Sequence, residues 1–378
     1  MDKHIVKKLM THKSGQFILS NKYDQNKLSP YIIQASILNE TIRDMPILPD
    51  IAASLNEELM IRSIFSTAAI EGNPLRHDEV SQIILKKEDA LNDKEKEICN
   101  LKQVYDLIDD SIPHKRIISE DFIKIVHSTI TAGINYKDNT PGKYRNHSVK
   151  VGDEEHGGTY TPPKILEDIR TLMDTFLKWF NIDLQDENCF IQSALTHLYL
   201  ALIHPFGQGN GRSARAIESL ILNAYGIRYV PKMLSNYYYR NIDEYYWAFS
   251  NTIKSLKSKE CDVTDFLEFA MKGIVESFRE LKDRNFWHIK RMALRDFCGH
   301  LLERKGINAR QHMLISLILN GPFPFSLKDL FNKDLFRPLY VNVSERTARR
   351  DVEALSKMGL LVLQEDDKFI VNLNLLTS

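Results

Sequence analysis

A chain of 378 residues is longer than one ordinary domain, and its 43% of hydrophobic residues can form a substantial core. Its 50 basic and 50 acidic residues cancel, which excludes a global attraction to nucleic acid or to a membrane surface, so any nucleic-acid binding must come from a local patch. Four scattered cysteines without metal-binding spacing, and no apolar run of membrane-spanning length, predict a cytoplasmic protein with no membrane partner.

The first clear element is an apolar helical pattern from Pro49 to Ile70. It ends because Gly72 suits the position after a helix and Pro74 blocks continuation. Glu71 therefore lies at the C-terminal end of a helix, where the dipole disfavours a carboxylate. We expect Glu71 either in solvent or beside a cation from elsewhere in the chain.

Residues 76–135 read as helices, and a hairpin follows at residues 146–161. Val149 and Val151 alternate before a turn at 153–158, after which a short polar segment returns. The hairpin is either a plain surface feature or an edge on which an extended peptide can dock.

His204 begins a twelve-residue stretch that ends at Arg215 and lies between two apolar helical runs. Gly209 and Gly211 allow a tight turn and a close approach of a ligand to the backbone. A turn that opens a helix points unpaired N–H groups and the positive end of the dipole at one place, which suits a phosphate. Arg212 and Arg215 share a face of the first turn and can reach the same polyphosphate. The alternative is a buried histidine in a glycine-rich corner.

The C-terminal quarter has three helical patterns followed by two short strands, the order of a winged helix–turn–helix. The third helix would present four side chains to a DNA groove, namely Arg346, Thr347, Arg349 and Arg350. The turn between the strands is acidic, so weak DNA binding, or use of this region to dock a protein, is also open.

The central stretch resembles the signature of the Fic family, H-x-F-x-(D/E)-G-N-G-R-x-x-R. The resemblance implies transfer of AMP from ATP to a hydroxyl side chain of a protein, with His204 as the general base. It also implies an ATP site formed by Gly207, Gln208, Gly209, Asn210, Gly211, Arg212 and Arg215. Gln208 stands where the family has an acidic ligand for Mg²⁺. An amide brings no charge, whereas Mg²⁺ prefers carboxylate and phosphate oxygens, so Gln208 is a doubtful metal ligand.

Two further segments resemble parts of Fic proteins. The residues from Thr67 to Gly72 resemble the inhibitory motif (S/T)-x-x-x-E-(G/N), which implies that Glu71 pairs with Arg215 and keeps ATP in a non-productive pose. Thr67 and Glu71 are therefore the candidate inhibitory residues, and Glu71 also borders the ATP site. In some relatives the same glutamate supports removal of AMP. The hairpin at 146–161 resembles the flap that docks the target protein.

A tyrosine-rich segment follows the signature, as the family has near the adenine. Tyr238 and Tyr239 can stack on the base, or they belong to an ordinary packed helix. Relatives often form homodimers, although no residue pattern here specifies one.

Together these patterns predict a mainly α protein with a small hairpin flap, in three parts. Residues 1–110 form an N-terminal helical region with the inhibitory motif, residues 111–304 the Fic core, and residues 305–378 the winged helix. The predicted activity is that of a self-inhibited protein adenylyltransferase that uses ATP and Mg²⁺. The alternatives are a DNA-binding regulator whose Fic region only senses nucleotide, and an enzyme that transfers a different group.

Overall fold

The computed structural model describes residues 4–86, 92–110, 117–321 and 324–377, and it divides into two compact units. The first unit comprises residues 1–44 and 48–281, and the second comprises residues 45–47 and 282–378. The expected boundary at 304/305 falls at the end of the long helix α11 (Thr264–Glu303), whereas the division between the units falls inside that helix. No helix in the described residues combines the length and apolar character needed to cross a membrane.

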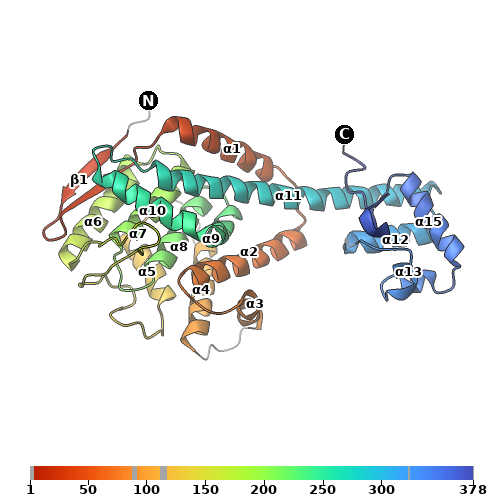
Figure 1. Ribbon diagram of the computed structural model, residues 1–378, viewed down its shortest axis with the longest axis horizontal. Helices are drawn as coiled ribbons and strands as arrows, with labels where there is room; N and C mark the ends of the chain where they lie inside the picture. Colours follow the sequence, from red (N-terminus) through yellow and green to blue (C-terminus); the bar gives the residue numbers. More distant parts are fainter. Residues whose placement is uncertain (1–3, 87–91, 111–116, 322–323, 378) are drawn as a thin grey trace. The chain divides into compact units, whose positions relative to one another are not determined.

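The first unit is a helical bundle, as the sequence predicted. Figure 1 shows α7 and α8 inside it, surrounded by other helices. Its elements before the flap are α1 (Gln25–Arg43), α2 (Pro49–Ile70), α3 (His77–Lys86), α4 (Asp93–Asp110) and α5 (Glu120–Ile130). Those after it are α6 (Leu166–Lys178), a π-helical turn (Trp179–Asp183), α7 (Cys189–Ile203), α8 (Asn210–Ala224), α9 (Val230–Arg240) and α10 (Ile242–Lys257).

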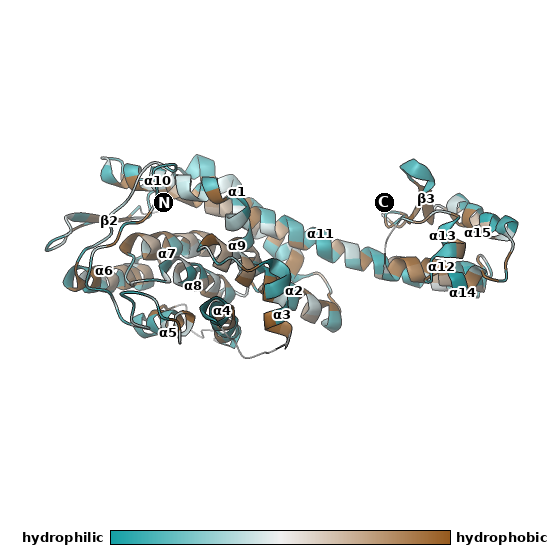
Figure 2. Cartoon of the chain, turned by 60° about the horizontal axis from the view of Figure 1, so that its bottom comes forward, coloured by the Kyte–Doolittle hydropathy of each residue, from teal (hydrophilic) through white to brown (hydrophobic). Residues whose placement is uncertain are grey.

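Burial explains why α7 and α8 lie in the centre. All residues of α7 except Cys189 and Ala201 are buried, which matches its nearly continuous apolar sequence. Figure 2 shows the brown, apolar residues along this helix. A helix that is apolar all round must be enclosed by others, so the turn that leaves α7 begins in the core of the unit.

The N-terminal residues form a hairpin that the sequence did not indicate. Strands β1 (Val6–Met10) and β2 (Gln16–Ser20) pair antiparallel. The turn between them is fixed by Asp168 of α6, whose carboxylate accepts the N–H groups of His12 at 2.7 Å and Lys13 at 3.1 Å. A carboxylate with several N–H donors is a strong anchor, so the hairpin is attached to the helical bundle.

The expected flap has fewer paired backbone residues than a regular hairpin. Val151 and Tyr160 form an isolated antiparallel bridge, with reciprocal N–H···O distances of 2.9 and 2.7 Å. At its tip Gly157 packs against α10, where an added Cβ would collide with the Ser250 side chain. The flap is thus a loop that is held by one bridge and packs against α10.

The second unit has its own buried core, formed by residues such as Leu314, Phe325 and Val352. Its elements are α12 (Ala309–Asn320), α13 (Asp329–Asn332), α14 (Arg337–Tyr340), α15 (Glu345–Lys357), β3 (Leu361–Leu363) and β4 (Phe369–Val371). A capping box between Asn308 and Gln311 starts α12. The two strands pair antiparallel around an exposed acidic turn at Glu365–Asp367.

Candidate active site

The turn between α7 and α8 is closed by its own side chains. His204 ends α7 in the left-handed region, with φ 50° and ψ 58°. Asn210 spans the turn, since its Oδ1 accepts the N–H of Phe206 at 2.9 Å and its Nδ2 donates to the carbonyl of Phe206 at 2.8 Å. The amide side chain of Asn210 therefore holds the loop, and its contribution to an anion site would be its backbone N–H.

His127 of α5 packs against the same turn. Its ring stacks on Phe206, with centroids 3.6 Å apart and planes 2° from parallel. Its Nδ1 accepts the N–H of Gly142 at 3.0 Å, so Nε2 carries the proton and donates to the carbonyl of Gln208 at 2.9 Å. Burial is the main cause that lowers the pKa of His127 to about 4. His127 is a neutral structural residue, not a ligand.

His204 has the geometry of a general base. Its Nδ1 lies 3.2 Å from the carbonyl oxygen of Ala201, and because a carbonyl only accepts, Nδ1 carries the proton. Nε2 is then the atom with a free lone pair. Burial first, and then the positive charge of Arg145, lower the pKa of His204 to about 4, so the ring is neutral at physiological pH.

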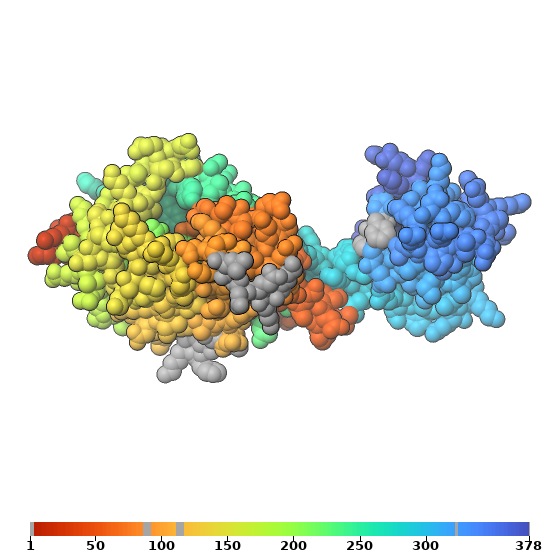
Figure 3. Space-filling view, turned by 90° about the horizontal axis from the view of Figure 1, so that it is seen from below, coloured from red at the N-terminus to blue at the C-terminus, as the bar shows by residue number. Residues whose placement is uncertain are grey.

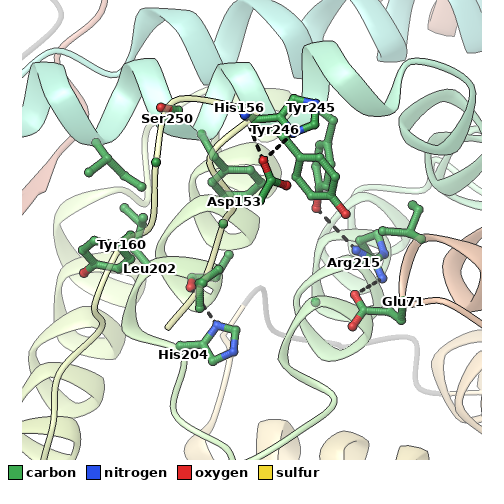
Figure 4. A pocket seen from close by; sticks show the side chains of 18 residues that line it. Glu71, Asp153, His156, Tyr160, Leu202, His204, Arg215, Tyr245, Tyr246 and Ser250 are labelled. Atoms are coloured by element: carbon green, nitrogen blue, oxygen red, sulfur yellow. Dashed lines mark hydrogen bonds and ion pairs between the residues drawn. The ribbon is translucent and has the colours of Figure 1, made fainter. Parts of the chain in front are cut away.

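His204 borders a cavity of about 320 Å³ that runs between the flap and α10. In Figure 3 the surface is hollowed between the yellow residues near 150 and the teal residues of α10. The close view in Figure 4 places His204 on one side and Glu71 with Arg215 on the other. The remaining lining side chains include Ile70, Val151, Asp153, His156, Tyr160, Leu202, Tyr245, Tyr246, Phe249 and Ile253.

Arg215 is held by four contacts on the inner wall of this cavity. Its Nε donates to the Thr67 hydroxyl at 2.8 Å, and its Nη2 donates to the Thr67 carbonyl at 3.2 Å and to Oε1 of Glu71 at 2.8 Å. The Tyr245 hydroxyl lies 3.4 Å from Nη1. The pair between Glu71 and Arg215 expected from the sequence is therefore present, and Thr67 is a second partner.

Glu71 also covers the start of α8. A Cβ added to Gly211 would collide with Oε1 of Glu71, so the carboxylate rests directly on the backbone at the N-terminus of that helix. Burial alone would raise the pKa of Glu71, but the charges of Arg215 and then Arg212 outweigh it and hold the pKa below its usual value. An anion therefore already lies at the anion-binding end of α8.

Arg212 does not line the cavity. Only 4% of its side chain is exposed, and its Nη1 donates to Oε1 of Glu97 on α4 and, at 2.8 Å, to the Tyr136 hydroxyl. The other oxygen of Glu97 accepts Nδ2 of Asn73 at 3.1 Å. Because Asn73 follows the Glu71–Gly72 turn, Glu97 connects Arg212 to the segment that carries Glu71.

Glu97, Asn73 and Tyr136 were missed from the sequence. Glu97 lies one residue before Ile98 and four before Leu101, which are fully buried core residues of α4. A carboxylate on the buried face of an apolar helical pattern was the available signal, because such a group needs a cationic partner.

The structure corrects the expectation for Tyr238 and Tyr239. Tyr238 is fully buried, and its hydroxyl donates to Oε1 of Glu218 at 2.7 Å. Tyr239 is 39% exposed and packs edge-on against Phe65. Neither lines the cavity, because α9 turns both away from it, and the aromatic side chains that do line it are Tyr245 and Tyr246 of α10.

Gln208 does not form a protein cage for a metal. Gln208 is exposed, and its backbone N–H donates to Oδ1 of Asn139 at 3.1 Å. Among the residues that the structure describes, no group of three His, Cys, Asp or Glu side chains could hold an ion. The turn offers one neutral amide oxygen, which does not fit the carboxylate that Mg²⁺ ordinarily uses beside phosphate oxygens.

The other residues expected at the site shape the turn. Gly209 is the N-cap of α8 with φ 78°, a conformation that favours glycine. A Cβ on Gly207 would collide with the backbone carbonyl of Asp138, so only glycine fits there. These two glycines are required by the path of the backbone as well as by any ligand.

In the second unit, Arg346, Arg349 and Arg350 are exposed on the first turns of α15. Thr347 is partly buried, and its N–H bonds to the Ser344 N-cap at 3.3 Å. The three arginines are available to a partner, whereas Thr347 belongs to the cap.

Comparisons with known proteins define the class of this site. Residues 117–222 match the sequence model of the Fic/DOC family, and this range contains the turn with His204 and Arg215. That part of the chain is a Fic domain, as the signature predicted. Among solved structures, a Fic family protein from Desulfovibrio desulfuricans G20 has a TM-score of 0.55 at 18% identity, covering 91% of this chain and 96% of that one. Fic-1 of C. elegans has a TM-score of 0.53 at 18% identity, covering 68% and 72%.

The curated relatives carry a more particular name. The chain is 26% identical over 189 residues to the protein adenylyltransferase Fic of Drosophila ananassae, and 25% identical over the same length to that of Drosophila melanogaster. These matches cover 48% of this chain and 36% and 37% of the relatives. The chain thus spans little more than a third of the length of the curated relatives it matches.

Proposed function

We propose that this protein transfers AMP from ATP to a hydroxyl side chain of a protein. The observation that supports this best is the neutral His204, whose open Nε2 borders the cavity that also contains Arg215 and the start of α8. The adenylyltransferase name of the relatives supports the same reaction. A base without a nearby phosphate site, or a phosphate site without a base, would not suit a nucleotidyl transfer.

In the proposed reaction the hydroxyl oxygen of the target attacks the α-phosphorus of ATP. A new phosphorus–oxygen bond forms, the bond to the β-phosphate breaks, and pyrophosphate leaves, while Nε2 of His204 takes the hydroxyl proton. The first N–H groups of α8 have no partner inside the helix and can bind phosphate oxygens. Arg215 would neutralise the outer phosphates. A divalent ion would have to be held mainly by ATP itself, because Gln208 brings no charge.

Glu71 restrains the reaction in two ways. It pairs with Arg215, and it occupies the N-terminus of α8 over Gly211. A carboxylate there repels phosphate and removes the cation that phosphate needs, so ATP can bind productively only after Glu71 moves. Thr67 keeps Arg215 in place during that movement, because its hydroxyl and carbonyl both accept from the guanidinium.

The target would dock along the flap, residues 146–161. Val151, Asp153 and Tyr160 line the cavity from that side, so a hydroxyl side chain on a peptide at the flap has a short path to His204. Recognition through the backbone edge tolerates varied target sequences. The target itself is a protein with an accessible serine, threonine or tyrosine.

Mass spectrometry after incubation with ATP and Mg²⁺ tests the proposal. We expect Glu71→Gly to gain adducts of about 329 Da, on itself or on an added target, at rates about tenfold or more above those of wild type. His204→Asn in the same background should gain none. Asparagine is the better inactivating residue because it tolerates the left-handed backbone of position 204. Absence of AMP from the Glu71→Gly protein, with ATP bound, would refute the transfer.

A second candidate function is DNA binding by the C-terminal part, residues 305–378, as a winged helix–turn–helix. The three exposed arginines of α15 favour it, and the acidic turn at Glu365–Asp367 opposes it. Retention of a labelled genomic DNA library by the wild-type chain, abolished in Arg346→Ala/Arg350→Ala, would support it. Equal retention by both proteins would refute it.

A further inference from the structure

Arg145, in the segment between α5 and the flap, grips the turn that carries His204. Its backbone N–H donates to the carbonyl of Pro205 at 3.0 Å, and its Nε donates to the carbonyl of His204 at 2.8 Å. Its Nη1 donates to the carbonyl of His147 at the start of the flap. One residue, 4% exposed, therefore contacts both peptide groups that follow the base, and its side chain joins the first of them to the flap.

The hydrogen bonds of Arg145 hold a strained part of the backbone. His204 has φ 50°, a conformation that costs a non-glycine residue on the order of 1–2 kcal/mol. Such a conformation persists only where neighbouring groups fix it. The bond from Nδ1 to the Ala201 carbonyl fixes the ring, and the two bonds from Arg145 fix the chain beyond it. The direction of Nε2 into the cavity depends on both.

The charge of Arg145 is not compensated. Among the residues that the structure describes, no carboxylate pairs with it, and its Nη2 is buried without a hydrogen-bond partner. Burial lowers the pKa of Arg145 to about 10, so the side chain is still protonated at neutral pH. A buried arginine usually has an acidic partner. Here its guanidinium donates to the carbonyl of His204 instead, and its positive charge lowers the pKa of that ring.

We propose that Arg145 is a positioning residue for the transfer reaction: it holds the left-handed turn that aims Nε2 of His204 into the cavity, and it places an uncompensated positive charge beside that residue. This inference rests on the proposed function. It assigns a role to a residue outside the signature, in the loop that leads to the flap. Movement of the flap when a target docks would be transmitted to the base through the bonds of Arg145.

Other charged groups face His204 across the cavity, and the variants compared in the pKa test leave these groups unchanged. Glu71 of α2 raises the pKa of His204, opposite to Arg145. The other titratable side chains that line the same cavity are Arg215 of α8, Asp153, His156 and Tyr160 of the flap, and Tyr245 and Tyr246 of α10.

The test compares Arg145→Gln and Arg145→Lys, with Arg170→Gln on the exposed face of α6 as the matched control. Histidine ring carbons are labelled, and the pKa of His204 is measured by NMR in the absence of nucleotide. We expect Arg145→Gln to raise it by about one unit, because the nearby cation is lost while burial remains. Arg145→Lys keeps the charge and should leave the pKa unchanged. Arg145 is not among the groups that shift the pKa of His127, so His127 is an internal reference that none of the variants should shift.

The second readout is the rate of AMP transfer in the Glu71→Gly background. Both variants should lower kcat about tenfold or more while the KM for ATP changes less than threefold, because lysine cannot reach several carbonyls as the planar guanidinium does. An unchanged pKa of His204 in Arg145→Gln, or a kcat within twofold of the parent in both variants, would overturn the inference. If the Glu71→Gly parent transfers no AMP, the proposed function fails, and the NMR titration alone still decides whether Arg145 acts on His204.

Discussion

Replacing Glu71 by glutamine isolates the charge of the proposed inhibitory contact from its shape. The amide fits the same space at 2.8 Å from Arg215, and Thr67 continues to hold the guanidinium. A hydrogen bond to a charged partner contributes about 1.5–3 kcal/mol, and one between neutral groups about 0.5–1.5 kcal/mol. Glutamine still faces a cation, so we estimate that Glu71→Gln weakens the competition with phosphate by about 1–2 kcal/mol. The Kd for ATP should therefore fall about 5- to 30-fold.

Isothermal titration calorimetry with a non-hydrolysable ATP analogue measures this change directly. Glu57→Gln is the matched control, because Glu57 is exposed on the same helix α2. The control should bind the analogue as the wild type does. A Kd for Glu71→Gln within twofold of wild type would mean that the carboxylate does not compete with phosphate, and the restraint would then have to come from the shape of the α2 terminus alone.

Three further outcomes follow from the same charges. The pKa of Glu71 is lowered in the folded protein, so its pair with Arg215 is present above its usual pKa and lost only as the pH falls through the lowered value; the ratio of ATP affinities between Glu71→Gln and wild type should stay constant from pH 8 to about 5. Gln208→Asp in the Glu71→Gly background should lower the Mg²⁺ concentration that gives half-maximal transfer, and an unchanged value would show that the amide is no handicap. Glu97→Gln leaves the buried Arg212 without its ion-pair partner and should lower the free energy of unfolding by about 3 kcal/mol, measured by urea denaturation; a loss below about 0.5 kcal/mol would contradict this.

The sequence predicted the parts of the site that are local in the chain. Helix α2 begins and ends where proline, glycine and the apolar spacing indicated, and the turn after His204 opens α8 as its glycines required. Pattern reasoning works there because the determinants are neighbours along the chain. The pairing of Glu71 with Arg215 is not local, and it was expected only because a family motif connected the two residues.

What the sequence could not predict depends on how separate segments pack. Arg145 and Glu97 act through residues far from them in the chain, and no spacing rule connects them to the signature. Base stacking and a packed helix were both open for Tyr238, because composition does not show which side of α9 faces the cavity. In the structure its hydroxyl donates to Glu218. The flap was expected as a hairpin but is a loop with one bridge, since its polar sequence offers few cross-strand contacts.

The burial of the two motif arginines has a consequence for how the protein responds to its medium. Exposed ion pairs weaken as salt is added, with a Debye length of about 8 Å at physiological ionic strength, but pairs removed from solvent are screened far less. Arg212 and its partner Glu97 are each 4% exposed, whereas Arg215 is 2% exposed and its partner Glu71 is 26% exposed. Changes in ionic strength should therefore leave the contact between Arg212 and Glu97 in place and weaken the contact between Arg215 and Glu71 less than they weaken a fully exposed pair. Under the proposed function, release of the site depends on displacement of the Glu71 side chain, so the expected trigger is a binding partner that moves this side chain and not a change in salt concentration.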